Sequence, residues 1–171
     1  MLYLRRNCDD LYMEKEPLKV RVLSAAKKLI SNSFPLLQDK KIRFFVLRFR
    51  FYACSVWIPP FMRFILISKR TRDFSDAVLE GIMAHELCHQ ERYLEMGIRR
   101  YLRFASGFIT SRKVQAAEER ATDMLTIEKG YGRQLYELSK IQYWDKKHQR
   151  INGNYLSLEE IKTYAKSLGK F

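Results

Sequence analysis

Residues 75–97 read SDAVLEGIMAHELCHQERYLEMG, and this stretch has the apolar spacing of one amphipathic helix. Its apolar residues recur three and four positions apart, which places them on one helix face. They are Val78, Leu79, Ile82, Met83 and Leu87. We expect Ser75 or Asp73 to cap the start of the helix and Gly97 to end it. The stretch therefore predicts a long helix packed against a core.

The segments before this helix predict one more helix and a small sheet. Residues 18–33 have apolar groups at helical spacing, and Pro35 fits an end of that helix near residue 33. Segments 42–50, 52–58 and 62–68 are rich in β-branched and aromatic residues and predict three strands, with Pro59-Pro60 forcing a break between the last two. We expect a mainly antiparallel three-stranded sheet with one face in contact with solvent.

Helices predominate after residue 97. We expect one at about 113–129 that stops at Gly130, one at about 133–147, and a last one that begins with a capping box. Residues 98–112 are basic and aromatic and fit no single element. The order of elements predicts an α+β fold. The chain of 171 residues fits one domain, with a core at about 18–130 and a C-terminal helical segment at about 131–171.

The composition indicates a basic protein that does not span a membrane. The formal net charge is +13, and the stretch from Lys40 to Arg72 has nine basic residues and no acidic one. Such a surface attracts nucleic acid, anionic membrane surfaces or acidic protein segments. No stretch is long and apolar enough for a membrane-spanning helix, and Arg5 and Arg6 interrupt any signal-peptide core. Three separated cysteines predict free thiols, so we expect a cytoplasmic location.

The sequence His85-Glu86-Leu87-Cys88-His89 within the long helix predicts a metal site. Two imidazoles four residues apart lie one turn above each other, where both can bind one tetrahedral zinc ion. Glu86 then lies beside the metal and can remove a proton from water as the general base. The alternative is a pair of exposed histidines beside the core, which the apolar surroundings disfavour.

A hydrolytic zinc site usually needs a third protein ligand. The segment AAEERATD at residues 116–123 offers Glu119, and Asp123 lies four residues further on the same helix face. We predict that Glu119 binds the metal and that Asp123 accepts a hydrogen bond from a ligating histidine. Glu118 is the less favoured alternative, and His148 lies far along the chain in a charged stretch.

HELCH, followed after 29 residues by E-R-A-T-D, resembles the gluzincin metallopeptidases, whose glutamate helix has the motif E-x-x-x-D. The order of elements is similar to the minigluzincins, which are small soluble proteins that resemble the catalytic cores of integral-membrane peptidases. The likeness covers about residues 18–130. It implies zinc bound by His85, His89 and Glu119, with Glu86 as general base and Asp123 as the residue that supports a ligating histidine.

The resemblance also implies features outside the metal site. A peptide substrate is expected to pair with the edge strand of the sheet, for which we take 52–58. Many gluzincins add a downstream tyrosine or histidine that stabilises the oxyanion, and four such residues are unassigned here: Tyr131, Tyr136, Tyr143 and His148. In minigluzincins a C-terminal segment can fill the cleft and keep the protein latent, and 131–171 corresponds to that segment.

Two hypotheses for the function follow. The first is a zinc-dependent metalloendopeptidase that acts on peptides or proteins, in an active or a latent form. The second is a basic zinc-containing module that binds nucleic acid or another polyanion without hydrolysis. Glu86 favours the enzyme, because a purely structural zinc site has no use for an adjacent base.

Overall fold

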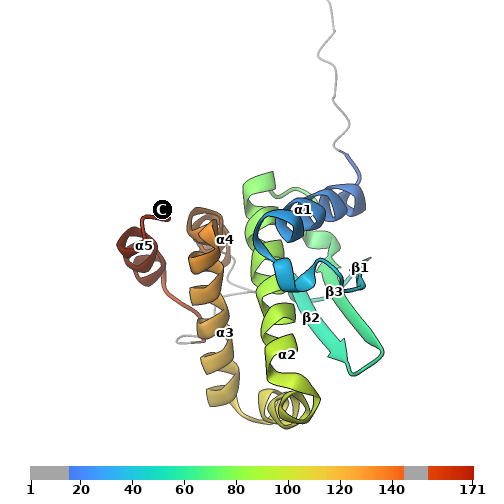
Figure 1. Cartoon of the computed structure of the whole chain (residues 1–171). Coiled ribbons are helices and arrows are strands. Elements are labelled where there is room, and N and C mark those ends of the chain that lie inside the picture. Colours follow the sequence, from blue (N-terminus) through green and yellow to red (C-terminus); the bar gives the residue numbers. More distant parts are fainter. Residues whose placement is uncertain (1–15, 145–153) are drawn as a thin grey trace, which may run out of the picture.

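The computed structural model of the protein describes residues 16–144 and 154–171 (Figure 1). Helix α1 (Leu18–Ser33) has the predicted bounds and buries one face, and the short turn η1 (Pro35–Leu37) follows it. The buried residues of α1 recur at helical spacing and pack into the core beside the sheet. They are Leu18, Val22, Ala26 and Leu29. The first amphipathic pattern in the sequence is thereby accounted for.

The sheet has three strands in the order β1-β3-β2. They are β1 (Ile42–Leu47), β2 (Ala53–Ile58) and β3 (Met62–Ser68). Strands β2 and β3 form an antiparallel pair, whereas β1 and β3 are parallel. The expected mainly antiparallel pairing therefore holds for β2 with β3 and not for β1 with β3. The reason is that β2 follows β1 along the chain but lies at the opposite edge of the sheet, and β3 lies between the two. This crossing makes β2 an edge strand.

Helix α2 (Asp76–Thr110) contains the HELCH segment and bends at Gly97. The hydroxyl of Ser75 accepts a hydrogen bond from the Val78 N–H, as a capping residue does. Gly97 has a φ of 67°, a left-handed conformation that ends the first helical run. Residues 98–110, which fit no element in the sequence analysis, form a second helical run after this bend.

The remaining helices follow the predicted order, and the α+β fold is confirmed. After α3 (Arg112–Thr126) comes η3 (Ile127–Tyr131), a wider helical turn in which Gly130 has a φ of 95°. Helices α4 (Gly132–Trp144) and α5 (Leu158–Ser167) complete the described chain. The predicted capping box at the start of α5 is present, since Ser157 and Glu160 each accept a backbone N–H of the other.

Helix α2 lies between two hydrophobic cores, and Figure 1 shows it running through the middle of the molecule. On one side, Met83 and Leu87 pack with α1 and the sheet. On the other side, Val78 and Ile82 pack with α4 and α5. The HELCH segment is buried because both sides of its helix are covered.

Among the described residues, no helix is long and apolar enough to cross a membrane. The predicted cytoplasmic location stays a prediction.

Candidate metal site and its pocket

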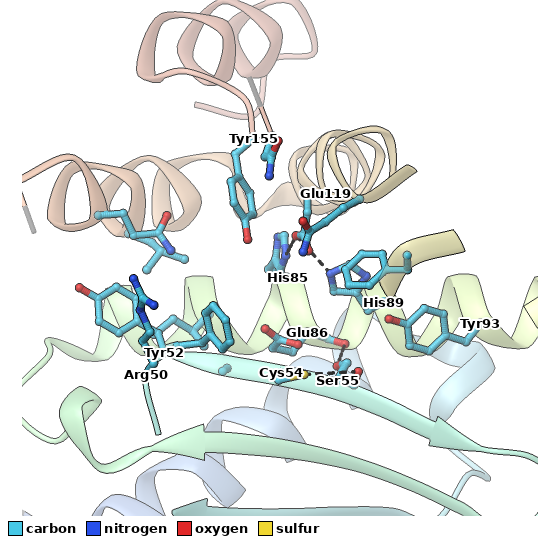
Figure 2. Close-up of a pocket in the computed structure, with 18 residues that line it drawn as sticks. Arg50, Tyr52, Cys54, Ser55, His85, Glu86, His89, Tyr93, Glu119 and Tyr155 are labelled. Atoms are coloured by element: carbon cyan, nitrogen blue, oxygen red, sulfur yellow. Dashed lines mark hydrogen bonds and ion pairs between the residues drawn. The ribbon is translucent and has the colours of Figure 1, made fainter. Parts of the chain in front are cut away.

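Three buried side chains from two helices converge on one point. Helix α2 provides His85 and His89, and α3 provides Glu119. Glu119 Oε2 lies 3.1 Å from His85 Nε2 and 3.5 Å from His89 Nε2. One ligand atom from each residue lies within 4.8 Å of the other two, so this cluster could hold a metal ion (Figure 2). Two imidazoles and a carboxylate match the donor set of catalytic zinc sites.

The far nitrogens of the two imidazoles also lie close to oxygen atoms of α3. His85 Nδ1 lies 3.0 Å from Asp123 Oδ1, and His89 Nδ1 lies 3.2 Å from Thr122 Oγ1. The contact between Thr122 and His89 is a hydrogen bond, whereas the contact between Asp123 and His85 is an ion-pair contact. Neighbours of this kind orient a ligating histidine. The histidines can therefore present Nε2 to a metal without rearrangement.

Neighbouring charges in the cluster shift the pKa values of its members in the direction opposite to the effect of burial. Burial alone would lower the pKa of His85, but the carboxylates of Asp123 and Glu119 raise that pKa to about 10. Burial also disfavours the charged form of His89, yet Glu119 and Glu118 raise its pKa to about 9. Burial would raise the pKa of Glu119, but the two histidines hold it well below its usual value. The carboxylates thus favour a positive charge at this position, and a metal cation that displaces imidazole protons can supply it.

Glu86 is buried in the same place but belongs to no ion pair among the described residues. Its side chain lies between His85 and strand β2 (Figure 2), and its Oε2 has no hydrogen-bond partner in the part of the chain that the structure describes. Burial raises the pKa of Glu86. A buried carboxylate oxygen without a partner is costly. This arrangement is consistent with a group that meets its partner, a water molecule or a substrate, in the pocket.

A pocket of about 400 Å³ opens over the cluster. Strand β2 forms one side through Cys54 and Ser55, and residues after α4 form the other through Tyr155 (Figure 2). The Ser55 hydroxyl donates a hydrogen bond of 2.7 Å to the backbone carbonyl of Glu86, which fixes β2 against α2. The pocket therefore places an edge strand beside the candidate metal site.

The structure brings together the five predicted site residues: His85, Glu86, His89, Glu119 and Asp123. The alternative ligand Glu118 lies 3.5 Å from the far nitrogen of His89, Nδ1, and its carboxylate accepts two hydrogen bonds of 2.8 and 2.7 Å from Arg92. His148 lies outside the described residues. Among the two adjacent glutamates, Glu119 is the one whose carboxylate contacts both histidines at Nε2.

Two of the four downstream oxyanion candidates lie away from the pocket. The Tyr131 hydroxyl forms a hydrogen bond with Ser33, and the Tyr136 ring packs edge-on against Phe171. The side chain of Tyr143 lies outside the described residues, as does His148. Tyr155, which the sequence analysis did not consider for this role, lines the pocket and points its hydroxyl towards His85 (Figure 2). Nothing in the sequence distinguishes it from the other tyrosines.

The C-terminal segment contributes directly to the site. Tyr155 and Asn154 line the pocket, and the next residue, Leu156, donates its N–H to Asp123 Oδ2 at 3.0 Å. Arg120 on α3 reaches the same segment, since its guanidinium donates to the Tyr155 carbonyl and pairs with Glu160. The predicted latency of this segment stays a prediction.

Comparison of the chain with protein-family models, curated proteins and solved structures found no match.

Proposed function

We propose that the protein is a zinc metallopeptidase of the gluzincin type. The observation behind this proposal is the convergence of His85, His89 and Glu119 beside a buried carboxylate, Glu86, that has an unpartnered oxygen. A structural zinc site normally has four protein ligands and no free base. Here three ligands and a pocket of about 400 Å³ leave room for a water molecule and a substrate group.

The residues fit zinc better than a hard cation. Two imidazole nitrogens and one carboxylate form the donor set of hydrolytic zinc sites, whereas calcium and magnesium prefer oxygen ligands alone. Held by these three residues, zinc would supply Lewis-acid chemistry, which brings the pKa of a water molecule to about 7 and polarises a peptide carbonyl.

Glu86 is proposed as the general base. It follows His85 on the helix, so its carboxylate reaches the pocket from the side of β2 (Figure 2). In hydrolysis, Glu86 would take the proton of the attacking water and later give it to the leaving amine. The raised pKa that burial imposes on Glu86 favours the first of these steps, the uptake of the proton from water.

The free edge of β2 is the proposed binding site for the substrate backbone. In an antiparallel pair, every second residue turns its backbone groups away from the partner strand. The Trp57 N–H points away in this manner and donates to the Tyr101 hydroxyl at 3.4 Å, so Tyr101 closes that end of the edge. Ser55, two residues earlier, presents its backbone groups on the same side and next to Glu86. An extended peptide paired there would bring one carbonyl over the site.

Tyr155 is proposed as the donor that stabilises the oxyanion. Its ring centroid lies 6.3 Å from that of His85, and its hydroxyl points into the pocket (Figure 2). A phenolic O–H can donate to a developing negative charge without a proton transfer. The hydrogen bond from Leu156 to Asp123 fixes the backbone next to this tyrosine.

The variant Glu86→Gln tests the proposal. It should bind zinc as the wild type does, and it should cleave an unfolded protein such as casein at least about 100-fold more slowly, because the base is lost. Zinc content is measured by atomic absorption and cleavage by gel. Glu95→Gln, an exposed position on the same helix, is the matched control and should keep both properties.

Wild-type cleavage by Glu86→Gln would refute the mechanism. A zinc-loaded wild type that binds DNA or RNA in a salt-dependent manner and cleaves no unfolded protein would favour the non-hydrolytic binding module.

A further inference from the structure

The helical run after Gly97 exposes a stripe of aliphatic side chains. Ile98, Leu102 and Ile109 are 46%, 56% and 84% exposed. They are spaced by four and seven residues, so they lie along one line of the helix. The line from the first to the last measures roughly 16 Å at 1.5 Å per residue. An exposed aliphatic stripe of this kind indicates a surface that is covered by something else.

Basic residues accompany the stripe without acidic ones. Residues 98–113 contain Arg99, Arg100, Arg103, Arg112 and Lys113 and no aspartate or glutamate. All five are exposed, and within residues 16–144 and 154–171 none of them has an ion-pair partner. Arg99 and Arg103 each follow a stripe residue, so they lie on the flank of the stripe, one position round the helix. The surface thus combines exposed apolar groups with exposed positive charge.

The other face of this helical run is anchored to the body of the protein. Tyr101 is buried, and its ring centroid lies 4.7 Å from that of Trp57 and 4.9 Å from that of Tyr93. The same contact places the run beside the end of β2, and Figure 1 shows it with the β2–β3 turn at the lower end of the view. Phe61 in that turn is 83% exposed. The two elements that carry these exposed apolar residues therefore lie at the same end of the molecule.

We propose that this end of the protein binds peripherally to anionic lipid surfaces, with the helical run of residues 98–110 lying in the membrane interface. The exposed arginines complement lipid phosphates, and the aliphatic stripe can enter the acyl boundary. Nucleic acid complements the charge equally well but leaves the stripe in water. Phe61 could stack on a base, but the side chains of the stripe itself are aliphatic and offer no stacking surface, which single-stranded sites normally provide through aromatic residues.

Binding in this manner would bring the pocket close to the lipid surface. Phe108 belongs to the same helical run and lines the pocket. Phe51, which is 65% exposed, also lines the pocket. A protein held there meets chains that are attached to, or emerge from, a membrane. The lipid-binding inference itself does not depend on the proposed peptidase activity.

Vesicle co-sedimentation tests the inference. The full chain is mixed with vesicles of phosphatidylcholine alone or with phosphatidylglycerol added, at low and at physiological salt. We expect binding to the anionic vesicles only, weakened by salt. Arg99→Gln with Arg103→Gln should weaken binding by about 5-fold for each charge removed. Leu102→Ser with Ile109→Ser should weaken it by roughly tenfold, because apolar burial is lost.

The matched control is Lys19→Gln with Lys27→Gln, which removes two exposed charges from α1 at another part of the molecule. It should change binding by less than about 2-fold. Thermal unfolding by circular dichroism verifies that every variant is folded. Absence of binding to anionic vesicles would overturn the inference, as would equal losses in the control and the Arg99/Arg103 variant. Unchanged vesicle binding by the Leu102/Ile109 variant, together with displacement by DNA or RNA, would identify a nucleic-acid surface instead.

Discussion

His85 Nδ1 lies 3.0 Å from Asp123 Oδ1, and the other oxygen of Asp123 accepts the N–H of Leu156. One carboxylate thus connects a candidate metal ligand to the C-terminal segment. Asp123 is fully buried, so both contacts are shielded from water. The orientation of His85 and the placement of residues 154–156 over the pocket are therefore coupled.

Asp123→Asn should weaken zinc binding by about 10- to 100-fold, because the amide supports the ligating histidine less well than a carboxylate. Competition with a chromophoric chelator measures the affinity. Asp39→Asn, at an exposed position, is the control and should bind zinc as the wild type does. An unchanged affinity in Asp123→Asn would show that the carboxylate does not support His85 in the metal-bound state.

The adjacent pair Glu118 and Glu119 should separate metal binding from stability. Glu119→Gln should lose most of the bound zinc, because the carboxylate that contacts both histidines is gone. Glu118→Gln should retain zinc but lose about 2 kcal/mol of unfolding free energy, because the amide keeps only one acceptor for Arg92 and has no charge. Metal content and urea unfolding of the metal-free proteins measure the two effects. Full zinc content in Glu119→Gln would exclude this residue as a ligand.

Much of the fold was predictable because local signals are strong at the ends of its elements. The helix at 18–33, the cap at Ser75, the stop at Gly97 and the capping box at Ser157 each depend on residues close in sequence. The parallel pairing of β1 with β3 was not predictable in this manner. Strand order depends on which edge the chain crosses to, and the strand patterns are the same for either order.

The candidate site was predictable where spacing along a helix fixes geometry. The four-residue spacing of His85 and His89, and of Glu119 and Asp123, places each pair on one face before the fold is known. Tyr155 was not predictable, because it reaches the pocket through contacts between α3 and the C-terminal segment that are far apart in sequence. The lipid-facing stripe was missed because residues 98–112 gave no single helical pattern.

A side chain at Gly81 should destabilise the protein. A Cβ at this position would lie 2.6 Å from the backbone carbonyl oxygen of Gln134 on α4, and backbone cannot move aside as a flexible side chain can. Gly81→Ala should therefore cost about 1–3 kcal/mol of unfolding free energy. Gly107→Ala is the matched control, since its Cβ would meet only Val114 at an ordinary 3.5 Å.

Because alanine has a higher helix propensity than glycine, Gly107→Ala should increase the free energy of unfolding by up to about 1 kcal/mol. Chemical denaturation of both variants measures the difference. Equal effects of the two substitutions would argue against the close packing of α2 on α4.

The ion pair between Arg120 and Glu160 should stabilise the protein in a pH-dependent manner. The hydrogen bond from Arg120 lowers the pKa of Glu160 to about 2. A lowered pKa means that the stabilisation is present at neutral pH and is lost as pH falls towards that value. Glu160→Gln keeps the capping box and removes the charge. It should cost less than about 1 kcal/mol at neutral pH, because both side chains are partly exposed.

The difference in unfolding free energy between wild type and Glu160→Gln should shrink from about pH 6 to about pH 3. Urea unfolding across this range measures it, and added salt should reduce it as well. A difference that grows towards acid pH would contradict the assigned ion pair.

Tyr155→Phe should separate catalysis from binding if the tyrosine donates to the oxyanion. The ring and its packing near His85 are kept, so KM for a peptide and zinc content should change little. The lost donor acts only when charge develops, so kcat should fall by about 10- to 1000-fold. Tyr136→Phe, whose ring packs on Phe171 away from the pocket, should leave kcat unchanged. Steady-state kinetics on a fluorogenic peptide measures both constants, and a rise in KM with constant kcat would instead identify Tyr155 as a residue that binds the substrate in its ground state.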